Sequence, residues 1–165
     1  SEESNYKMAK ENLFTNNIFK SENIYRIKGE NDPFEEVINY NNILKENLSV
    51  KNNIARFDLI ILGLGDDGHT ASLFPHEFKN LRDKEECIVA THPSSGQKRI
   101  SLSEKIINNA KEVIFHVSGA GKKYVVDKII NNRGNYKSYP ASYINPESAN
   151  LSWYLDFEAS EMLTK

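Results

Sequence analysis

The stretch Leu62-Gly63-Leu64-Gly65-Asp66-Asp67-Gly68-His69-Thr70-Ala71-Ser72-Leu73-Phe74-Pro75 combines three glycines, two carboxylates and an imidazole. It follows residues 57–62, an apolar run interrupted only by Asp58, which predicts a buried β-strand. The glycines then predict a sharp turn of the chain at the end of that strand. Open α/β sheets bind their ligands at the carboxyl ends of strands. The stretch therefore predicts an α/β fold with a chemically active loop at a strand end.

Within this loop, Asp67 and His69 are the candidate catalytic pair. A histidine imidazole titrates near neutrality, and a neighbouring carboxylate can fix its tautomer and raise its basicity. The alternative interpretation is a loop histidine that is hydrogen-bonded to Asp67 for structural reasons alone. The density of glycines and acids around His69 favours the catalytic interpretation, because catalytic groups are commonly placed at strand ends.

The spacing of the three glycines also matches the G-x-G-x-x-G fingerprint of dinucleotide-binding loops. Three features oppose that interpretation. Asp66 and Asp67 place negative charge where a pyrophosphate would bind, and Pro75 interrupts any helix that starts at the turn. The next predicted strand, residues 87–91, is not followed by the acidic residue that binds a ribose. A nucleotide site is therefore disfavoured.

The composition predicts an ordinary globular protein with a single domain over residues 1–165. Apolar residues make up 39% and charged residues 27% of the sequence, which is typical of a globular domain. The net charge of −2 gives no basis for binding nucleic acid or an anionic membrane. No apolar run is long enough to span a membrane, and the single cysteine, Cys87, suits a reducing compartment. We therefore expect a cytoplasmic protein, and we interpret asparagine pairs such as Asn52-Asn53 as compositional bias in surface loops.

Helical and strand patterns alternate along the chain, which predicts a mainly parallel, Rossmann-like sheet flanked by helices. Capping signals mark three helix starts: Ser4 or Asn5, the motif Asp32-Pro33-x-Glu35, and the capping box Ser101-x-x-Glu104. The predicted helices cover residues 6–13, 33–48, 104–110, 125–130 and 158–163, and the predicted strands cover residues 57–62, 87–91, 113–117 and 153–157.

A second glycine-rich junction, Ser118-Gly119-Ala120-Gly121-Lys122, follows the predicted strand 113–117. Glycines let backbone N–H groups approach an anion, and the following helix directs its positive end toward it. Lys122 adds a full positive charge, so the junction is a candidate site for a phosphate or a carboxylate. An ordinary tight turn with a solvated lysine is an equally good interpretation, because the P-loop spacing is absent. Arg99, taken alone, is typical of a surface arginine between a strand and a helix.

Other reactive residues give weaker signals. His76 lacks the second histidine of a zinc helix, and no metal-ligand spacing occurs in the sequence, so no metal is expected. Ser72 lacks the Gly-x-Ser-x-Gly elbow of a hydrolase nucleophile. His92 is interpreted as a strand terminus, and His116 as a satisfied core or edge histidine.

Five motifs, in the same order along the chain, resemble those of the 6-phosphogluconolactonase family. Residues 63–75 resemble its central signature. The related glucosamine-6-phosphate deaminases share the Asp-Gly-His core but continue with Ile-Ala-Phe-Asn-Glu-Pro, whereas residues 70–75 here lack the acid that assists sugar ring chemistry in those enzymes. The other matching segments are Ser4-Asn5-Tyr6-x-Met8-Ala9, Arg99-Ile100-Ser101-Leu102-Ser103, Ser118-Gly119-Ala120-Gly121-Lys122, and the closing pair Pro140-Ala141-Ser142 and Trp153-Tyr154-Leu155-Asp156.

The resemblance implies hydrolysis of 6-phospho-D-glucono-1,5-lactone to 6-phosphogluconate in the oxidative pentose phosphate pathway. It implies that His69, oriented by Asp67, deprotonates the attacking water molecule and then protonates the leaving ring oxygen. No metal or cofactor is expected, because a lactone is already an activated ester.

The resemblance also implies that Arg99 and Lys122 hold the phosphate group of the substrate. The backbone N–H groups near Gly65 and Gly68 are expected to face the developing oxyanion. Two other classes of function stay open: a sugar-phosphate isomerase or deaminase on the same fold, and a non-catalytic sugar-phosphate-binding protein.

The sequence also departs from the family pattern. Family members begin with a strand, a Gly-Gly-Ser-Thr-Pro-like phosphate loop and an Asp-Glu-Arg motif, none of which occurs here. We therefore expect the C-terminal part of the fold, without the family's N-terminal strands, and only half of the active site. Some unicellular parasites fuse the lactonase to glucose-6-phosphate dehydrogenase, which makes that enzyme a candidate partner. Residues 91–97 stand where the family often has a proline-rich substrate loop, and substrate contacts there are not assigned.

Overall fold

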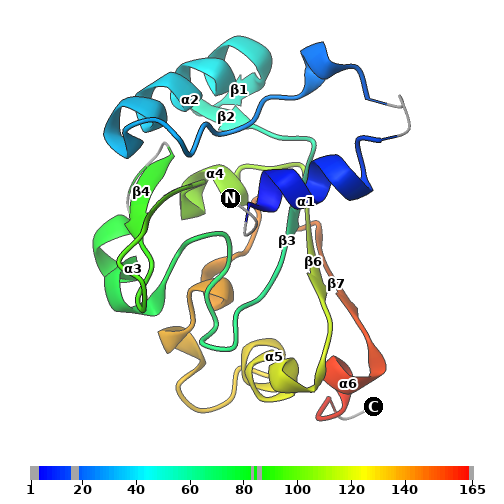
Figure 1. Ribbon diagram of the computed structural model, residues 1–165. Helices are drawn as coiled ribbons and strands as arrows, with labels where there is room; N and C mark the ends of the chain where they lie inside the picture. Colours follow the sequence, from blue (N-terminus) through cyan, green and yellow to red (C-terminus); the bar gives the residue numbers. More distant parts are fainter. Residues whose placement is uncertain (1–3, 16–18, 83, 85–86, 164–165) are drawn as a thin grey trace.

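The computed structural model describes residues 4–15, 19–82, 84 and 87–163. Helices and strands alternate along most of the chain (Figure 1). The helices are α1 (Asn5–Asn12), α2 (Pro33–Asn47), α3 (Pro75–Leu81), α4 (Glu104–Asn108), α5 (Lys123–Ile130) and α6 (Phe157–Ser160). The strands are β1 (Ser49–Lys51), β2 (Ile54–Arg56), β3 (Leu59–Leu62), β4 (Ile88–Thr91), β5 (Lys98–Ser101), β6 (Glu112–Val117) and β7 (Leu151–Leu155). Short 3-10 turns are η1 (Ser21–Asn23), η2 (Ala120–Lys122), η3 (Tyr136–Ser138) and η4 (Pro140–Tyr143).

A three-stranded parallel sheet in the order β3-β6-β7 forms the centre of the fold (Figure 1). In its register Ile61 pairs with Ile114, and His116 pairs with Tyr154. Parallel neighbours need crossover connections, and these contain α3 and α4 between β3 and β6, and α5 between β6 and β7. The prediction of a mainly parallel sheet flanked by helices is confirmed.

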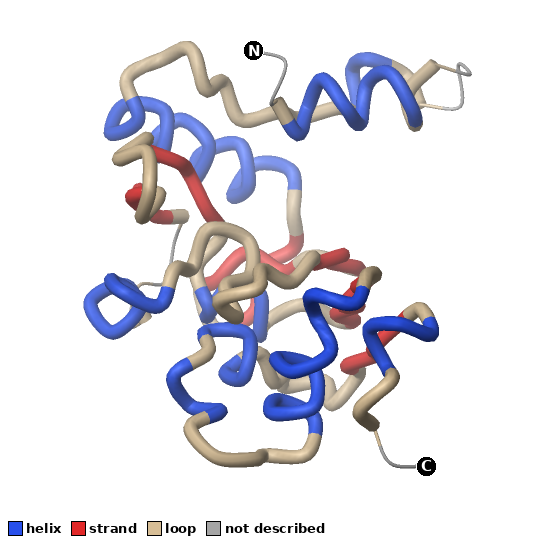
Figure 2. The backbone as a smooth tube through the Cα atoms, turned by 60° about the horizontal axis from the view of Figure 1, so that its bottom comes forward, coloured by secondary structure: helices blue, strands red, loops and turns tan. Residues whose placement is uncertain are grey.

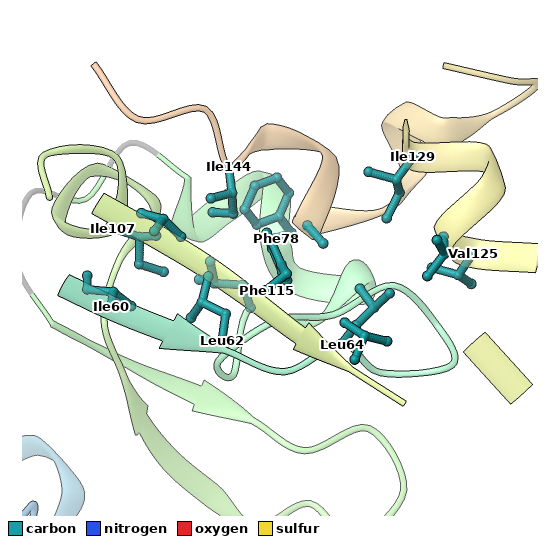
Figure 3. Packing of buried hydrophobic residues seen from close by; sticks show 14 of the residues in the cluster. Ile60, Leu62, Leu64, Phe78, Ile107, Phe115, Val125, Ile129 and Ile144 are labelled. Atoms are coloured by element: carbon teal, nitrogen blue, oxygen red, sulfur yellow. The ribbon is translucent and has the colours of Figure 1, made fainter. Parts of the chain in front are cut away.

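One face of this sheet packs against helices and forms the main hydrophobic core (Figure 3). Ile60 and Leu62 of β3 and Phe115 of β6 are buried in it. Phe78 of α3 and Ile107 of α4 pack in the same cluster, together with residues of α5. Because apolar burial on this face holds β3 and β6 together, the loops at their carboxyl ends start from a fixed frame.

The other face of β3 is exposed, whereas the apolar run at residues 57–62 predicted a buried strand. Successive side chains of a strand point to opposite faces. Leu59 and Ile61 therefore point away from the core, and they are 44% and 66% exposed. An apolar run identifies a strand, but only the packing of other elements decides whether both of its faces are covered.

Strand β4 does not join the parallel sheet, which corrects the expectation that residues 87–91 supply one of its strands. It pairs antiparallel with β5, so that Ala90 lies opposite Arg99. The connection of residues 92–97 suits a hairpin but is too short for the crossover that a parallel pair requires. Arg99 therefore lies within a strand, and not in a link between a strand and a helix.

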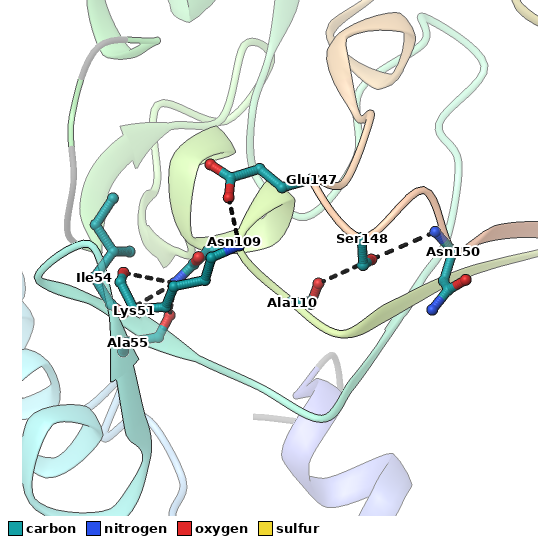
Figure 4. Close-up of polar contacts among 8 residues, drawn as sticks. All are labelled: Lys51, Ile54, Ala55, Asn109, Ala110, Glu147, Ser148 and Asn150. Atoms are coloured by element: carbon teal, nitrogen blue, oxygen red, sulfur yellow. Dashed lines mark hydrogen bonds and ion pairs between the residues drawn. The ribbon is translucent and has the colours of Figure 1, made fainter.

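A second hairpin, β1-β2, corrects the interpretation of Asn52-Asn53 as compositional bias. The two residues form its turn and have positive φ angles of 54° and 63°. Asparagine tolerates this left-handed conformation better than most residues, and two-residue hairpin turns require it. The side chain of Asn109 then ties the hairpin to the end of α4 by donating to three backbone carbonyl groups, those of Lys51, Ile54 and Ala55 (Figure 4).

Two of the three predicted helix caps are present. Ser4 caps α1 and Asp32 caps α2, each by accepting backbone N–H groups of the first turn. The N-cap of α4 is Ser103, so the capping box predicted at Ser101 is wrong by two residues. The hydroxyl of Ser101 instead accepts the backbone N–H of Ser72 at 2.9 Å, and this bond fastens β5 to the glycine-rich loop.

The last elements begin earlier than predicted. Strand β7 starts at Leu151 instead of residue 153, and α6 starts at Phe157 instead of residue 158.

Pro75 occupies the first position of α3, where proline is favoured, so no helix starts directly at the glycine turn. Within the described ranges, none of the helices has the length and apolar character needed to cross a membrane.

Candidate active site

The loops that follow β3 and β6 meet at the carboxyl ends of these two strands. In Figure 1 this end of the sheet lies toward α5 and α6, and Figure 2 brings it forward. The loop after β3 carries Asp67 and His69, and the turn after β6 carries Lys122. Parallel pairing of the strands is what brings these two segments, distant in the sequence, to one edge.

Asp67 and His69 are in direct contact. The Nδ1 atom of His69 lies 2.5 Å from Oδ1 of Asp67, and the backbone N–H of His69 donates to the same oxygen at 3.1 Å. An ionised carboxylate only accepts hydrogen bonds, so Nδ1 carries the proton in the neutral ring and Nε2 is left with its lone pair. The side chain of His69 is 31% exposed and that of Asp67 is 43% exposed, so Nε2 can accept a proton from a molecule in the solvent.

The environment of Asp67 keeps its carboxyl group ionised. Partial burial alone raises its pKa, but the hydrogen bonds from the backbone N–H and the ring of His69 outweigh burial, and the net pKa is lowered. A carboxylate that stays charged at neutral pH stabilises an imidazolium beside it. The pair therefore has the charge distribution that a general base requires as it takes up a proton.

Gly65 has no side chain, and the imidazole of His69 and the carboxylate of Asp67 occupy the space that a side chain there would fill. A Cβ atom on Gly65 would lie 2.1 Å from Nδ1 of His69 and 2.7 Å from Oδ1 of Asp67. Real Cβ atoms do not approach other atoms so closely, so any larger residue would displace the imidazole or the carboxylate. The loop therefore needs glycine here for space.

The backbone N–H groups of Gly65 and Gly68 both donate hydrogen bonds within the loop itself. The N–H of Gly65 donates to the carbonyl oxygen of His69 at 2.9 Å, and the N–H of Gly68 donates to the carbonyl oxygen of Gly65 at 3.0 Å. Both of these donors are therefore used to close the loop on itself, and the expectation of oxyanion donors near the two glycines stays a prediction for the other amides of the loop. The glycines act on the site through shape and loop closure.

Gly68 is positioned by the segment around η4. Its φ angle is +79°, and a Cβ atom there would lie 2.3 Å from the ring of Tyr139. Its carbonyl oxygen accepts the N–H of Ala141 at 3.1 Å. The Pro140-Ala141-Ser142 motif therefore packs against the loop that carries Asp67 and His69, which gives this sequence motif a structural role.

A buried ring, Phe74, backs the imidazole of His69. Phe74 is 1% exposed, and the two ring centroids lie 4.8 Å apart. The ring of His92, from the loop of the β4-β5 hairpin, meets the same phenyl ring edge-on at 5.4 Å. His76 of α3 also lies beside this ring, at 6.1 Å between centroids, so three histidines surround Phe74. Sequence analysis treated His92 as a strand terminus, because nothing local to it indicates the approach to Phe74.

Arg99 lies on the same hairpin, on strand β5. Residues two positions apart in a strand share a face, so Arg99 is on the side of Ser101, which bonds to Ser72 in the catalytic loop. Its side chain is half-buried. Within the described part of the chain, no acidic side chain or carbonyl group bonds to its guanidinium group. An unpaired guanidinium beside the loop is available to a phosphate or carboxylate.

Lys122 joins the turn after β6 to the catalytic loop. Its ammonium group lies 2.5 Å from Oδ1 of Asp66, although its side chain is only 24% exposed. The turn itself begins at Gly119, whose φ angle of +98° few other residues adopt. The structure pairs Lys122 with a carboxylate of the protein, and whether the junction binds an external anion stays a prediction.

Metal-ligating side chains and cavities are the remaining features that concern ligand binding. In the described ranges, no group of three or more histidine, cysteine, aspartate or glutamate side chains is arranged to hold a metal ion. A hollow of about 490 Å³ lies between α1 and residues 19–24, and none of its lining residues belongs to the catalytic loop. The catalytic pair is instead at an open edge of the sheet, where the half-exposed imidazole meets the solvent.

The fold and the site together define a class of protein: an α/β domain with a hydrogen-bonded aspartate–histidine pair and a lysine at the carboxyl end of a parallel sheet. Residues 1–153 match the family model described as glucosamine-6-phosphate isomerases/6-phosphogluconolactonase. The chain belongs to this family.

Individual relatives agree with this assignment. The chain is 40% identical, over 98% of its length, to a 6-phosphogluconolactonase of Aggregatibacter actinomycetemcomitans, and it spans 67% of that relative. Its fold matches a crystal structure of the devB protein with a TM-score of 0.91 and 37% identity, over 99% of this chain and 68% of that one. A human GDH/6PGL endoplasmic bifunctional protein is 40% identical over 62% of this chain, which corresponds to 13% of the human protein. The chain thus spans about two thirds of the Aggregatibacter relative and of the devB protein.

Proposed function

We propose that this chain carries the lactone-hydrolysing site of a 6-phosphogluconolactonase, which converts 6-phospho-D-glucono-1,5-lactone to 6-phosphogluconate. The observation that carries the proposal is the contact between Asp67 and His69, which leaves Nε2 of the imidazole free to act as a base. The names of the relatives and the two cations beside the loop support the same substrate, a lactone that bears a phosphate.

In the first step, Nε2 of His69 removes a proton from a water molecule. The oxygen of that water attacks the lactone carbonyl carbon, and the carbonyl oxygen takes the negative charge. Asp67 stabilises the imidazolium that forms, since its lowered pKa keeps it ionised. Gly65 and Gly68 contribute by carrying no side chains, so that His69 with Asp67 and the ring of Tyr139 can pack against the loop in their places.

In the second step, the tetrahedral intermediate collapses and the bond between the carbonyl carbon and the ring oxygen breaks. The imidazolium of His69 donates its proton to the leaving ring oxygen, which becomes a hydroxyl group. The product is a carboxylic acid that ionises in neutral water, and His69 returns to its neutral form. The steps balance with water as the only co-reactant.

Arg99 and Lys122 hold the phosphate in this proposal. Both cations lie next to the catalytic loop, Arg99 through β5 and Lys122 through its contact with Asp66. A phosphate held at two points fixes the orientation of the lactone carbonyl relative to the imidazole. Such positioning lowers the barrier because the reacting groups no longer need to find one another.

The replacement of His69 by alanine tests the proposal. Lactone hydrolysis is followed by the oxidation of 6-phosphogluconate with a coupling dehydrogenase, and an enzyme-free sample corrects for spontaneous hydrolysis. We expect a loss on the order of 100- to 10,000-fold in kcat, as for other positioned acid/base groups. His116→Ala is the matched control, because this exposed histidine lies on β6 outside the site. Unchanged turnover by the His69→Ala protein would contradict the mechanism.

Two assays separate this function from its alternatives. The segment of residues 70–75 contains no carboxylate, so we expect no release of ammonia from glucosamine 6-phosphate. Ammonia release at a rate above the lactonase rate would favour a deaminase. Binding of 6-phosphogluconate by calorimetry, without turnover of the lactone, would favour a binding protein.

The same proposal places the chain in the oxidative pentose phosphate pathway, as a cytoplasmic partner of glucose-6-phosphate dehydrogenase, either fused to it or working beside it. The bifunctional human relative supports a link between the two activities. Cys87 is buried and is the single cysteine of the sequence, which is in keeping with a reducing compartment. Fractionation of cells that express the native gene, with antibodies against both enzymes, tests the location and the link.

A further inference from the structure

The anion-binding turn after β6 already holds two carboxylates of the protein. The backbone N–H of Gly119 donates to Oδ2 of Asp156 at 2.9 Å, and the ammonium group of Lys122 donates to Oδ1 of Asp66. The same Asp66 oxygen would lie 3.6 Å from a Cβ atom on Gly121, so the carboxylate sits against the turn. Both carboxylates occupy places that an incoming anion could use.

The two carboxylates are held very differently. Asp156 is fixed at both oxygens, because its Oδ1 also caps α6 by accepting the N–H of Ala159 at 2.8 Å. Asp66 is 76% exposed, and within the described part of the chain its carboxylate contacts Lys122 and no other donor. Rotation of Asp66 into water therefore breaks a single ion pair whose carboxylate is already in contact with solvent, and ion pairs that solvent reaches contribute little to stability.

We propose that Asp66 is an internal counter-ion that occupies Lys122 in the empty site and is displaced by the phosphate of the substrate. This inference rests on the proposed function, and it makes Asp66 a specificity-determining residue. The competing carboxylate is tethered next to Lys122, so its effective concentration is on the order of millimolar or higher.

The chemistry of the competitor decides which ligands Lys122 accepts. A free carboxylate carries one negative charge, as Asp66 does, and gains nothing by replacing it. A phosphate monoester near neutral pH carries close to two charges and presents three acceptor oxygens, so it displaces Asp66. Asp66 thus reserves Lys122 for the phosphate end of the ligand and weakens binding of the carboxylate of the product at the same place.

The experiment compares Asp66→Asn with the native chain. Asparagine keeps the size of the side chain and removes its charge. We expect KM for the lactone and the inhibition constant of inorganic phosphate to fall about two- to fivefold, because an exposed ion pair no longer competes. Because Asp66 acts on binding alone, kcat should change less than twofold, and acetate should inhibit the variant more strongly than the native protein.

Asp58→Asn is the matched control. Asp58 forms an ion pair with Lys111 at 2.5 Å and is 84% exposed, but it precedes β3, at the end of the strand opposite the site. This variant should leave KM and both inhibition constants unchanged. A higher KM, an unchanged phosphate constant or a fall in kcat for Asp66→Asn overturns the inference. If the native chain neither hydrolyses the lactone nor binds inorganic phosphate, the proposed function fails and the inference fails with it.

Discussion

Gly65 and His69 compete for one place: a methyl group on Gly65 would lie 2.1 Å from Nδ1 of the imidazole. The backbone of the loop closes around this contact, since the N–H of Gly65 bonds to the carbonyl oxygen of His69. The absence of a side chain at one residue therefore fixes where the other can lie.

Gly65→Ala should abolish most activity. The added methyl group must push the imidazole away from Asp67, and displacement of a general base costs on the order of 100-fold or more in kcat. Gly63→Ala is the control, because a Cβ atom there meets nothing within 4 Å. The lactonase assay, combined with thermal unfolding of both variants, checks this; equal losses of activity in the two variants would contradict it.

Asp67→Ala should lower kcat more than Asp67→Asn does. The oxygen that faces Nδ1 also accepts the backbone N–H of His69, and an asparagine carbonyl can keep both bonds while losing the charge. We expect about a tenfold loss for asparagine and about a 100-fold loss or more for alanine. Steady-state kinetics of the two variants measure the difference, and an asparagine variant as inactive as the alanine variant would show that charge alone matters.

The stabilising effect of Asp67 should depend on pH. Its pKa is lowered in the folded protein, because the hydrogen bonds from His69 outweigh the opposing effect of burial. Such a group stabilises the fold above its unfolded-state pKa, and the contribution is lost as the pH falls through the folded-state pKa. The difference in unfolding free energy between the native protein and Asp67→Asn should therefore stay constant from about pH 7 to about pH 5 and shrink as the pH falls below the ordinary aspartate pKa of about 3.9. Urea unfolding across this range measures it, and a difference that grows toward low pH contradicts the prediction.

Lys122→Ala and Arg99→Ala should act mainly on substrate binding. Each removes one charge-assisted contact to the phosphate, which corresponds to about a 10- to 100-fold rise in KM. Lys111→Ala serves as the control, because Lys111 pairs with Asp58 on the surface. Inhibition by inorganic phosphate should weaken in the two site variants. A fall in kcat at unchanged KM would assign these residues to another role.

Truncation of two neighbouring isoleucines in β3 should change the unfolding free energy by very different amounts. Ile60 is 7% exposed and lies in the core, whereas Ile61 is 66% exposed. Ile60→Ala should lower the unfolding free energy by about 2–5 kcal/mol, because it removes buried contacts and leaves a cavity. Ile61→Ala should change it by no more than about 0.5 kcal/mol. Denaturant unfolding of the two variants checks which face of the sheet is covered, and similar losses would show that both faces are.

Sequence patterns predicted elements well where the stabilising partner is close in the chain. Ser4 and Asp32 cap their helices through bonds to the following turn, as their positions indicate. Prediction failed where the partner is distant. Ser101 has the spacing of a capping box, but its hydroxyl bonds to Ser72 instead. Asn52-Asn53 shows the opposite error, because a genuine local turn signal was taken for composition.

Sequence patterns alone were enough to predict the parallel α/β class, the family and the contact between Asp67 and His69, because that contact is a local hydrogen bond across a glycine turn. Three relations were visible only in the folded molecule: Lys122 meets Asp66, His92 and His69 share the ring of Phe74, and Ile61 faces outward. These relations depend on strand pairing and on which face of the sheet is packed. Neither strand pairing nor the packed face of the sheet can be read directly from residue spacing along the chain.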